Sequence, residues 1–298
     1  MDNSDKKRFP EGIITAVITP FSDGQTDISA FKASILRQID AGIGGIVVLG
    51  TTGEAPTVSK TERERLIDAA LECADGKIFI IAGCGASDTK AALKSAKEAQ
   101  KQGVNGILTV TPYYNKPSQK GLIYHYLSVA EGLDIPVMMY NVPSRTGVSI
   151  SAETSEVLFA HENITALKEA CTDISEIYDK LTQLSAYDIY CGNDSLLPAF
   201  LALGARGCVS VVSNALPRAF GQIYKDCASG ECKRSSEAFK KIYPLLKALC
   251  LDTNPSGIKS LMANLGYCRD ELRLPLTRTR SDTACAIFDA YIQTDMNG

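Results

Sequence analysis

The stretch Ala41–Val48, AGIGGIVV, holds the pattern that decides the fold. A helical segment stops there at a glycine, and after a tight loop a short apolar run without charges begins. The same order of helix, glycine, loop and strand recurs in KQGVNGILTV at Lys101–Val110 and in ALGARGCVSV at Ala202–Val211. Repetition of this unit along one chain predicts right-handed βαβ connections and a parallel sheet.

Eight short apolar runs alternate with longer amphipathic segments along the chain. Each run is rich in Ile, Val or Leu and poor in charge, as expected of parallel strands that are buried on both faces. We expect these strands at Ile13–Ile18, Gly45–Leu49, Ile78–Ala82, Gly106–Val110, Pro136–Tyr140, Ile164–Lys168, Asp188–Cys191 and Cys208–Val212. Since eight such units close into a barrel, the predicted fold class is α/β, a (β/α)8 TIM barrel.

The segments between the predicted strands have apolar residues at helical spacing. The clearest helices are expected at Ser29–Ala41, Ser59–Ala74, Thr89–Gly103, Asp194–Gly204, Glu231–Leu251 and Thr279–Ile292. SKTE at Ser59–Glu62 is a predicted capping box, and Gly42 and Gly103 are predicted caps at helix ends. Asp194 is expected to cap the helix that begins there, with a metal ligand as the alternative for Asn193-Asp194.

The chain after residue 214 shows a helical pattern only, with a Pro- and Gly-marked segment between its last two predicted helices. We therefore expect a barrel over residues 1–214, and the last barrel helix with a C-terminal helical extension over residues 215–298. No linker, low-complexity tract or charge block divides the chain, so both parts are predicted to belong to one structural unit.

The composition describes an ordinary globular chain, with 45% hydrophobic residues and a formal net charge of −3. Nucleic-acid-binding proteins show a basic surplus or stripe, so we expect no nucleic-acid partner. No apolar stretch approaches the roughly 18 residues of a membrane-spanning helix, so no membrane partner is expected either. The basic cluster at residues 6–8 precedes Phe9-Pro10 and not an apolar run, so no signal peptide is predicted and the expected location is cytoplasmic.

The ten cysteines are scattered, and none forms a C-x-x-C pair. With only His125 and His161 in the sequence, no zinc-site spacing occurs, so no metal site is predicted. In a cytosolic chain such cysteines are expected to stay reduced and to serve as small core residues.

Barrel active sites lie at the carboxyl ends of the strands, and polar residues follow several of the predicted strands. These segments are GTTGE at Gly50–Glu54, TVTPYY at Thr109–Tyr114, YNVPSRTG at Tyr140–Gly147, KEA at Lys168–Ala170 and GND at Gly192–Asp194. Because the carboxyl ends of barrel strands meet at one rim, we expect these segments to form a single catalytic site.

Lys168 closes the apolar run Ile164–Leu167, so its ammonium group is expected inside the barrel mouth. Partial desolvation favours the neutral form of a lysine, which then attacks carbonyl groups as a nucleophile. The sequence therefore predicts a Schiff-base lysine. On position alone, the alternative is a lysine that marks the strand end and points to solvent.

Other residues of the same rim are candidates on residue type. Arg145 offers a two-pronged donor for a carboxylate, and Thr51-Thr52 between glycines offers N–H groups and hydroxyls to a small anion. Tyr140, at a strand end, suits proton transfer to a reacting oxygen. The alternatives are a surface arginine, an ordinary turn and a packing tyrosine. The prediction therefore depends on their joint occurrence at successive strand ends.

These motifs resemble those of the dihydrodipicolinate synthase and N-acetylneuraminate lyase family, the class I pyruvate-dependent aldolases. The resemblance covers nearly the whole chain, from ITAVITPF at Ile14–Phe21 to LRLPLT at Leu272–Thr277. It is carried by GTTGE, by TVTPYYNKPSQKGL at Thr109–Leu122, by YNVPSRTG and by KEA. YNVPSRTG discriminates most, because related lyases of sialic acid or sugar acids usually lack its Ser-Arg-Thr-Gly arrangement.

The resemblance implies a lyase that condenses pyruvate with L-aspartate 4-semialdehyde in the diaminopimelate route to lysine. It implies a Schiff base on Lys168 and no cofactor. Tyr140, Thr51 and Tyr114 match the proton relay of the family, in which the residue at the place of Tyr114 reaches into the site of the neighbouring subunit.

The resemblance also implies substrate contacts and an assembly. Thr51, Thr52 and the backbone around Gly192 and Val209 match positions that contact pyruvate. Arg145 matches the residue that holds the carboxylate of the semialdehyde. A relay that spans two subunits implies a homo-oligomer, and the family is typically a tetramer built from two tight dimers.

One departure from the family concerns feedback inhibition by lysine. Family members that lysine inhibits bind it at the dimer interface through Ser, His, Asn and Glu side chains and a tyrosine. The matching positions of this chain hold Ala55, Pro56, Lys60, Ser87, Ala91 and Tyr113. Of the lysine-binding side chains, only the tyrosine is present in this chain. Lysine would therefore find no amide or carboxylate partner here, and we expect weak or no inhibition by it.

Two alternatives to this function stay open. One is a sister lyase of the same fold, such as an N-acetylneuraminate lyase or a 2-keto-3-deoxy sugar acid aldolase, which substrate profiling distinguishes. The other is a barrel that has lost catalysis and serves as a binding or regulatory protein. Such a protein has no need of all five candidate side chains. These are Lys168, Tyr140, Thr51, Tyr114 and Arg145.

Overall fold

The computed structural model describes residues 8–295 and contains a closed barrel of eight parallel strands, hydrogen-bonded in the order β1-β10-β9-β8-β7-β6-β5-β4. Their bounds are β1 Gly12–Ala16, β4 Gly45–Val48, β5 Phe79–Gly83, β6 Gly106–Val110, β7 Val137–Asn141, β8 Ile164–Glu169, β9 Asp188–Cys191 and β10 Gly207–Ser210. Each overlaps a predicted strand, and no end differs from the prediction by more than two residues. The predicted TIM barrel is therefore confirmed.

The described residues fall into two compact units. Of the described residues, unit 1 contains 8–11 and Phe79–Val209, and unit 2 contains Gly12–Ile78 and 210–295. The boundary that the sequence predicts after residue 214 stays a prediction.

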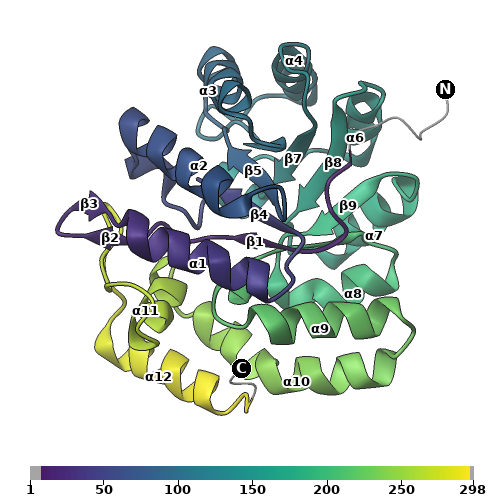
Figure 1. Cartoon of the computed structure of the whole chain (residues 1–298). Coiled ribbons are helices and arrows are strands. Elements are labelled where there is room, and N and C mark those ends of the chain that lie inside the picture. The colour runs from purple at the N-terminus through teal and green to yellow at the C-terminus, as the bar shows by residue number, and fades with distance from the viewer. Residues whose placement is uncertain (1–7, 296–298) are drawn as a thin grey trace. The chain divides into compact units, whose positions relative to one another are not determined.

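Unit 1 carries the segments after β6, β7, β8 and β9, which include the predicted Schiff-base lysine. Its helices are α3 Thr89–Gln102, α4 Gln119–Ala130, α5 Pro143–Thr146, α6 Ala152–Phe159, α7 Ile174–Gln183 and α8 Leu197–Ala202. Helix α4 packs between α3 and α6 (Figure 1). All residues of β7 and β8 are buried, as expected of central strands that are covered on both faces.

Unit 2 carries the GTTGE loop and the C-terminal helices. Its helices are α1 Ile28–Asp40, α2 Lys60–Ala74, α9 Pro217–Ala228, α10 Cys232–Leu249, α11 Ser256–Asn264 and α12 Ser281–Ile292. Helix α1 packs on α2, α9 lies beside α10, and α12 packs on both α10 and α11 (Figure 1). The predicted C-terminal helical extension is therefore present. Helix α11 is not predicted by the sequence, and it forms because its residues Ser256 to Met262 are all buried by tertiary packing.

Several helix ends follow the predicted signals. In the capping box, Ser59 N donates to Glu62 Oε2 at 2.9 Å, and Glu62 N donates to Ser59 Oγ at 3.4 Å. Gly42 and Gly103 have φ values of +73° and +100°, in the left-handed region that glycine tolerates.

The helix predicted from Asp194 begins differently. Asn193 is the cap, because its side chain accepts a hydrogen bond from Ser195 N at 3.1 Å, so the prediction for Asp194 is wrong. A single 3-10 turn, η3 Asp194–Leu196, precedes α8. Pro198, at the start of α8, has no N–H and so donates no hydrogen bond to the turn before it.

A small hairpin, β2 Phe21–Ser22 with β3 Gln25–Thr26, was not predicted because it is too short to show periodicity. Its turn, Asp23-Gly24, has positive φ at both residues. Glu271 accepts from the N–H groups of Asp23 and Gly24 at 3.0 and 2.6 Å. The hairpin thus lies beside the C-terminal segment of the same unit (Figure 1).

All ten cysteines lie among the described residues, and none of them forms a disulfide bond. The prediction that they are core residues holds for Cys84, Cys171, Cys191 and Cys208. It is wrong for the exposed ones, Cys232, Cys250 and Cys285. None of the helices in residues 8–295 is long and apolar enough to cross a membrane. Of the basic cluster at residues 6–8, the first two residues lie outside the described part.

Candidate active site

Lys168 lies in β8 between two tyrosines of the neighbouring strands. Its register partners are Tyr140 in β7 and Tyr190 in β9. The lysine is only 6% exposed, which excludes the alternative of a side chain pointing to solvent. Its Nζ lies 4.2 Å from the centroid of the Tyr140 ring, within the range of a cation–π interaction. The predicted nucleophile and the predicted proton-transfer residue are therefore in contact.

Gly192 makes room for the side chain of Lys168. A Cβ added at Gly192 would lie 3.1 Å from Lys168 Cε, 2.8 Å from Ala170 Cβ and 2.9 Å from Glu169 O. The two shortest of these distances are ones that real Cβ atoms essentially never show, and the third is unusually tight, so a larger residue would shift the strand and press on the lysine stem. The sequence predicts a pyruvate contact for the backbone of Gly192, and the structure adds this steric role.

Tyr140 is 7% exposed, and its carbonyl group is fixed by the residue that follows β6. Thr111 donates to Tyr140 O through both its backbone N and its Oγ1, each at 3.0 Å. Thr111 was missed by the sequence reasoning. Its only signal is its place in TVTPYY, directly after a strand that neighbours the tyrosine.

Arg145 lies in the single turn of α5 and is exposed, so it is accessible to a substrate carboxylate. The turn ends at Gly147, which has a φ of +72°. A Cβ at Gly147 would lie 2.9 Å from Lys116 Cε, so the loop after β6 rests on the turn that carries Arg145.

Tyr114, in that same loop, is placed very differently from Tyr140. Its side chain is 92% exposed, and its backbone has a φ of +74°. The left-handed region costs a non-glycine residue about 1–2 kcal/mol, and such strain is concentrated at functional sites. The structure thus leaves Tyr114 open to another molecule. The neighbouring Tyr113 is 40% exposed.

Thr51 and Thr52 follow β4 in unit 2, and their placement against Lys168 stays a prediction. Thr51 is half-buried, whereas Thr52 is buried. The Oγ1 atom of Thr52 accepts a hydrogen bond from Asn254 Nδ2 at 3.0 Å. Asn254 comes from the segment before α11, so the C-terminal extension holds this loop.

A buried ion pair supports the same loop. Glu54 ends the GTTGE motif with a φ of +52°, and its Oε1 lies 2.5 Å from the Nζ of Lys259 in α11. Both side chains are 0% exposed. Lys259 also lies 4.0 Å from the centroid of the Phe21 ring, and Glu54 Oε2 accepts from Arg273 N at 3.2 Å. Burial lowers the pKa of Lys259, while the carboxylate of Glu54 opposes that shift.

A second buried cluster lies directly behind Lys168. Glu169 accepts from Lys180 Nζ at 2.7 Å, from Asn141 Nδ2 at 2.9 Å and from Cys171 N at 2.7 Å. Burial raises the pKa of Glu169, and these donors oppose the shift. The sequence reasoning did not single out any of these residues, although Asn141 and Glu169 lie within the quoted motifs.

The remaining predicted residues lie at other strand ends of unit 1. Val209 is 1% exposed and belongs to β10, which pairs with β9. Asn193-Asp194 follow β9 as predicted. Among residues 8–295, no group of three or more His, Cys, Asp and Glu side chains is arranged to hold a metal ion.

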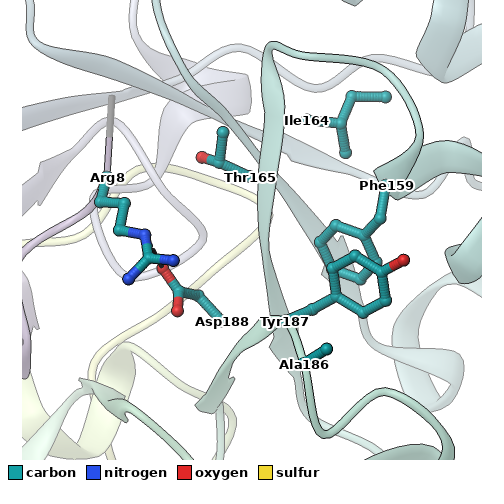
Figure 2. A pocket seen from close by; sticks show the side chains of 7 residues that line it. All are labelled: Arg8, Phe159, Ile164, Thr165, Ala186, Tyr187 and Asp188. Carbon is teal, nitrogen blue, oxygen red and sulfur yellow. Dashed lines mark ion pairs between the residues drawn. The ribbon is translucent and has the colours of Figure 1, made fainter. Parts of the chain in front are cut away.

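A small pocket of unit 1 lies at the opposite ends of these strands. Ile164 begins β8 and Asp188 begins β9, and both line it. Figure 2 shows the stacked rings of Phe159 and Tyr187 and the ion pair between Arg8 and Asp188. Because barrel chemistry belongs to the carboxyl ends of the strands, this pocket is separate from the Lys168 site.

The model of the dihydrodipicolinate synthetase family matches residues 9–291. The chain belongs to this family. The 4-hydroxy-tetrahydrodipicolinate synthase of Thermotoga neapolitana is 41% identical over 277 residues, which cover 91% of this chain and 94% of that protein. As a member of the dihydrodipicolinate synthetase family the chain is a lyase, so the predicted family and the predicted enzyme class are confirmed.

Solved structures of the family agree with the fold. The dihydrodipicolinate synthase of Thermotoga maritima has a TM-score of 0.95 and 38% identity, covering 97% of this chain and 100% of that chain. Another, described as the first monomeric dihydrodipicolinate synthase variant, has a TM-score of 0.94 and 38% identity over 96% of this chain and 97% of its own.

Proposed function

We propose that the chain condenses pyruvate with L-aspartate 4-semialdehyde through a Schiff base on Lys168. The observation that carries the proposal is the buried Lys168, with its Nζ 4.2 Å from the ring of Tyr140, in a chain of this family. An amine that is shielded from water next to a phenol is suited to attack a ketone and to exchange protons with it.

The bond changes follow from the chemistry of the two substrates. The neutral Nζ of Lys168 adds to the keto carbon of pyruvate, and loss of water gives an iminium ion. Loss of a methyl proton turns it into an enamine, whose carbon attacks the aldehyde carbon of the semialdehyde. The amine of the semialdehyde then adds to the iminium carbon and displaces Lys168, which closes the ring and frees the enzyme.

Tyr140 is proposed to carry protons between these intermediates and Thr51. Its backbone is fixed by Thr111, and its buried ring lies beside Lys168, where its hydroxyl can take up or release a proton. Tyr114 of a neighbouring subunit would complete the relay, which agrees with its 92% exposure in a single chain.

Two groups of residues are proposed to bind the substrates. Thr51 and Thr52, with the backbone around Gly192 and Val209, would hold pyruvate. Arg145 would bind the carboxylate of the semialdehyde, since its exposed guanidinium group offers two parallel donors. The Schiff base supplies the electron sink of the reaction, so we propose that no external cofactor takes part.

Borohydride trapping tests the proposal. Pyruvate and borohydride should leave a reduced adduct on Lys168, identified by mass spectrometry of the digested protein, and none in Lys168→Met. Lys101→Met, which removes an exposed lysine of α3, is the matched control and should label like the wild type. An adduct on another residue, or none, would contradict the proposal. Assays with N-acetylneuraminate and 2-keto-3-deoxy sugar acids then separate the sister lyases.

A homo-oligomer, a tetramer of two tight dimers, is part of the proposal, and mixing of subunits tests the shared relay. Tyr114→Phe and Lys168→Met should each lose activity by about 100-fold or more when pure. Mixed dimers contain one site with an intact lysine and an intact partner tyrosine, so activity should return on mixing. If no activity returns although mixed dimers form, Tyr114 does not act across the interface.

Weak or absent feedback by lysine is proposed from the substitutions near the GTTGE loop. In the structure Pro56 is exposed, Ala55 is half-buried, and neither offers a side-chain partner to an ammonium or carboxylate group. Millimolar L-lysine should therefore leave the condensation rate nearly unchanged. Strong inhibition at that concentration would show that other residues of the interface bind lysine.

A further inference from the structure

We propose that Asn141, Glu169 and Lys180, a buried cluster that we call the carboxylate brace, position Lys168 and Tyr140 for Schiff-base formation. This inference rests on the proposed function. Asn141 directly follows Tyr140 in β7, Glu169 directly follows Lys168 in β8, and Lys180 reaches them from α7. No member of the brace needs to touch a substrate, so its role is positioning.

The carboxylate of Glu169, at the centre of the brace, accepts hydrogen bonds at both of its oxygens. Asn141 Nδ2 donates to both oxygens of Glu169, each at 2.9 Å. Cys171 N donates to Oε1 at 2.7 Å, and Lys180 Nζ donates to Oε2 at 2.7 Å. With two oxygens and four hydrogen bonds, Glu169 has little freedom to change rotamer.

The register of β7 and β8 transmits this rigidity to the reacting groups. Tyr140 pairs with Lys168, and the next pair along the two strands is Asn141 with Glu169. Successive side chains of a strand point to opposite faces of the sheet. The lysine and the tyrosine therefore share one face, while the brace joins the same two strands on the other face. The bridge sets the spacing and twist of the strands at the point where the amine and the phenol meet.

A second arm of the brace reaches the loop that carries Arg145. Asn141 Oδ1 accepts from Ile150 N at 2.9 Å, and Asn141 Nδ2 donates to Ser149 Oγ at 3.1 Å. Lys180 Nζ also donates to Ser149 Oγ at 3.3 Å. Ser149 and Ile150 follow the turn of α5, so one cluster connects both strands with the segment that presents the arginine.

The positive charge of Lys180 is needed to balance the carboxylate of Glu169, because the brace is buried away from water. The side chains of Glu169 and Lys180 are 0% and 2% exposed, and Glu176 shares the ammonium group at 2.6 Å. A buried carboxylate without a cation is strongly unfavourable, so loss of Lys180 would disturb folding as well as position. The test must therefore separate the amount of folded protein from the rate at which that protein reacts.

Time-resolved borohydride trapping with pyruvate makes that separation. The final amount of adduct reports the competent fraction, and the rate constant at saturating pyruvate reports how well the amine is placed. The informative variant is Glu169→Gln with Lys180→Met, which removes the two buried charges together and leaves Glu176, whose side chain is 33% exposed, in contact with water. Replacement of a buried ion pair by neutral side chains of similar size is often neutral for stability. It nevertheless replaces one of the two oxygens that accept from Asn141 Nδ2 with an amide donor, so the two donors face each other and the bridge between the strands is weakened.

The double variant should reach nearly the wild-type amount of adduct on Lys168, with a thermal midpoint near that of the wild type. Its rate constant should fall by about 10-fold or more, since small misplacements of reacting groups have large effects on rate. Its affinity for pyruvate should change by less than about two-fold, because none of the proposed pyruvate contacts belongs to the brace. Lys180→Arg keeps the charge and should retain more of the rate than Lys180→Met.

A matched control lies at the other end of the strands. Asp188 begins β9 and forms an ion pair with Arg206 at 3.5 Å, with its side chain 15% exposed. Asp188→Asn should alter stability but not the rate constant of trapping.

Two outcomes would overturn the inference in different ways. If the wild type labels at Lys168 and the double variant labels at a rate within about two-fold of it, the brace is only structural. If the wild type forms no adduct at Lys168, the proposed function fails and the brace has no lysine to position.

Discussion

Two buried lysine–glutamate pairs support the predicted site from two regions of the chain. In unit 1, Glu169 and Lys180 are eleven residues apart in sequence and 2.7 Å apart in space, behind Lys168. In unit 2, Glu54 and Lys259 are 205 residues apart in sequence and 2.5 Å apart in space, behind the Thr51-Thr52 loop. The two pairs contain the same residue types, but the cost of burying their charges is offset by different hydrogen-bond partners.

The local pair is the better hydrogen-bonded. Lys180 contacts two carboxylates and Ser149, and Glu169 accepts from Asn141 and from a backbone N–H as well. Lys259 has a single carboxylate partner and the ring of Phe21. Burial acts on the acid in the first pair, raising the pKa of Glu169, and on the base in the second, lowering the pKa of Lys259. The local pair therefore belongs to a hydrogen-bonded network, whereas the distant pair depends mainly on one ion pair.

The largest expected effect is on stability, from Lys180→Met. It leaves Glu169 as a buried charge without a cation, so the free energy of unfolding should fall by about 3–5 kcal/mol. Lys259→Met should lower it by less, because the charge of Arg273 still acts on the buried carboxylate of Glu54 after the lysine is lost. Guanidinium unfolding at a fixed protein concentration compares the two. A larger loss from Lys259→Met would reverse the ranking of the pairs.

Gly192→Ala tests whether packing, and not only charge, places Lys168. The new Cβ would lie 3.1 Å from Lys168 Cε, so we expect slower adduct formation and a loss of about 1–3 kcal/mol in stability from overpacking. Gly221→Ala is the control, because a Cβ there meets only Ile43 Cδ1 at 3.9 Å. Unchanged trapping kinetics in Gly192→Ala would mean that the lysine has room to move.

Lys259→Met should weaken the binding of pyruvate, whereas changes in the brace should lower the rate of adduct formation. Loss of the Glu54 partner loosens the loop of Thr51-Thr52, so KM for pyruvate should rise by about 10-fold, or about 1.4 kcal/mol. The rate constant of adduct formation at saturating pyruvate should change much less. Steady-state kinetics combined with trapping separates the two quantities. If Lys259→Met and the brace variant change the same quantity, the two regions do not have separate roles.

The smallest effect concerns acid stability around the distant pair. Arg273 donates its backbone N–H to Glu54, and its hydrogen bonds to Glu62 lower the pKa of that carboxyl group from 4.5 to about 2. A lowered carboxyl pKa contributes stability that is complete above the unfolded value and is lost as the pH falls toward the folded one. Between about pH 5 and about pH 3, the thermal midpoint of the wild type should therefore fall more steeply than that of Glu62→Gln.

Glu62→Gln is a clean comparison for that measurement, because glutamine preserves the capping box with Ser59. At neutral pH the two proteins should differ by a constant amount. Parallel curves across the acid range would show that the Arg273 contact does not shift the titration of Glu62.

Local signals explain what could be predicted. Short apolar runs located all eight strands, and one of these runs correctly placed Lys168 near the carboxyl end of a strand. The same kind of signal failed where short segments depend on contacts. The turn Asp23-Gly24 and helix α11 have no periodicity of their own and are held by Glu271 and by burial. Asn193 displaced Asp194 as a helix cap because a one-residue difference lies below what a pattern resolves.

The sequence gives a signal for only some residues of the brace. Asn141 and Glu169 are polar residues at the ends of buried strands, which is itself a signal that they need partners. Lys180 and Lys259 give no such signal, because a lysine in an amphipathic helix resembles any solvated lysine. Only the packing of their helices shows that both ammonium groups are buried away from water.

The barrel, the family and the strand that carries Lys168 follow from the sequence, because periodicity, glycine stops and contiguous motifs are encoded within short stretches. The tertiary structure alone decided which lysine faces which carboxylate, that Gly192 leaves space for the lysine stem, and that Tyr140 is buried while Tyr114 is exposed. These are properties of distance and solvent access, which arise only when residues far apart in the chain are packed together.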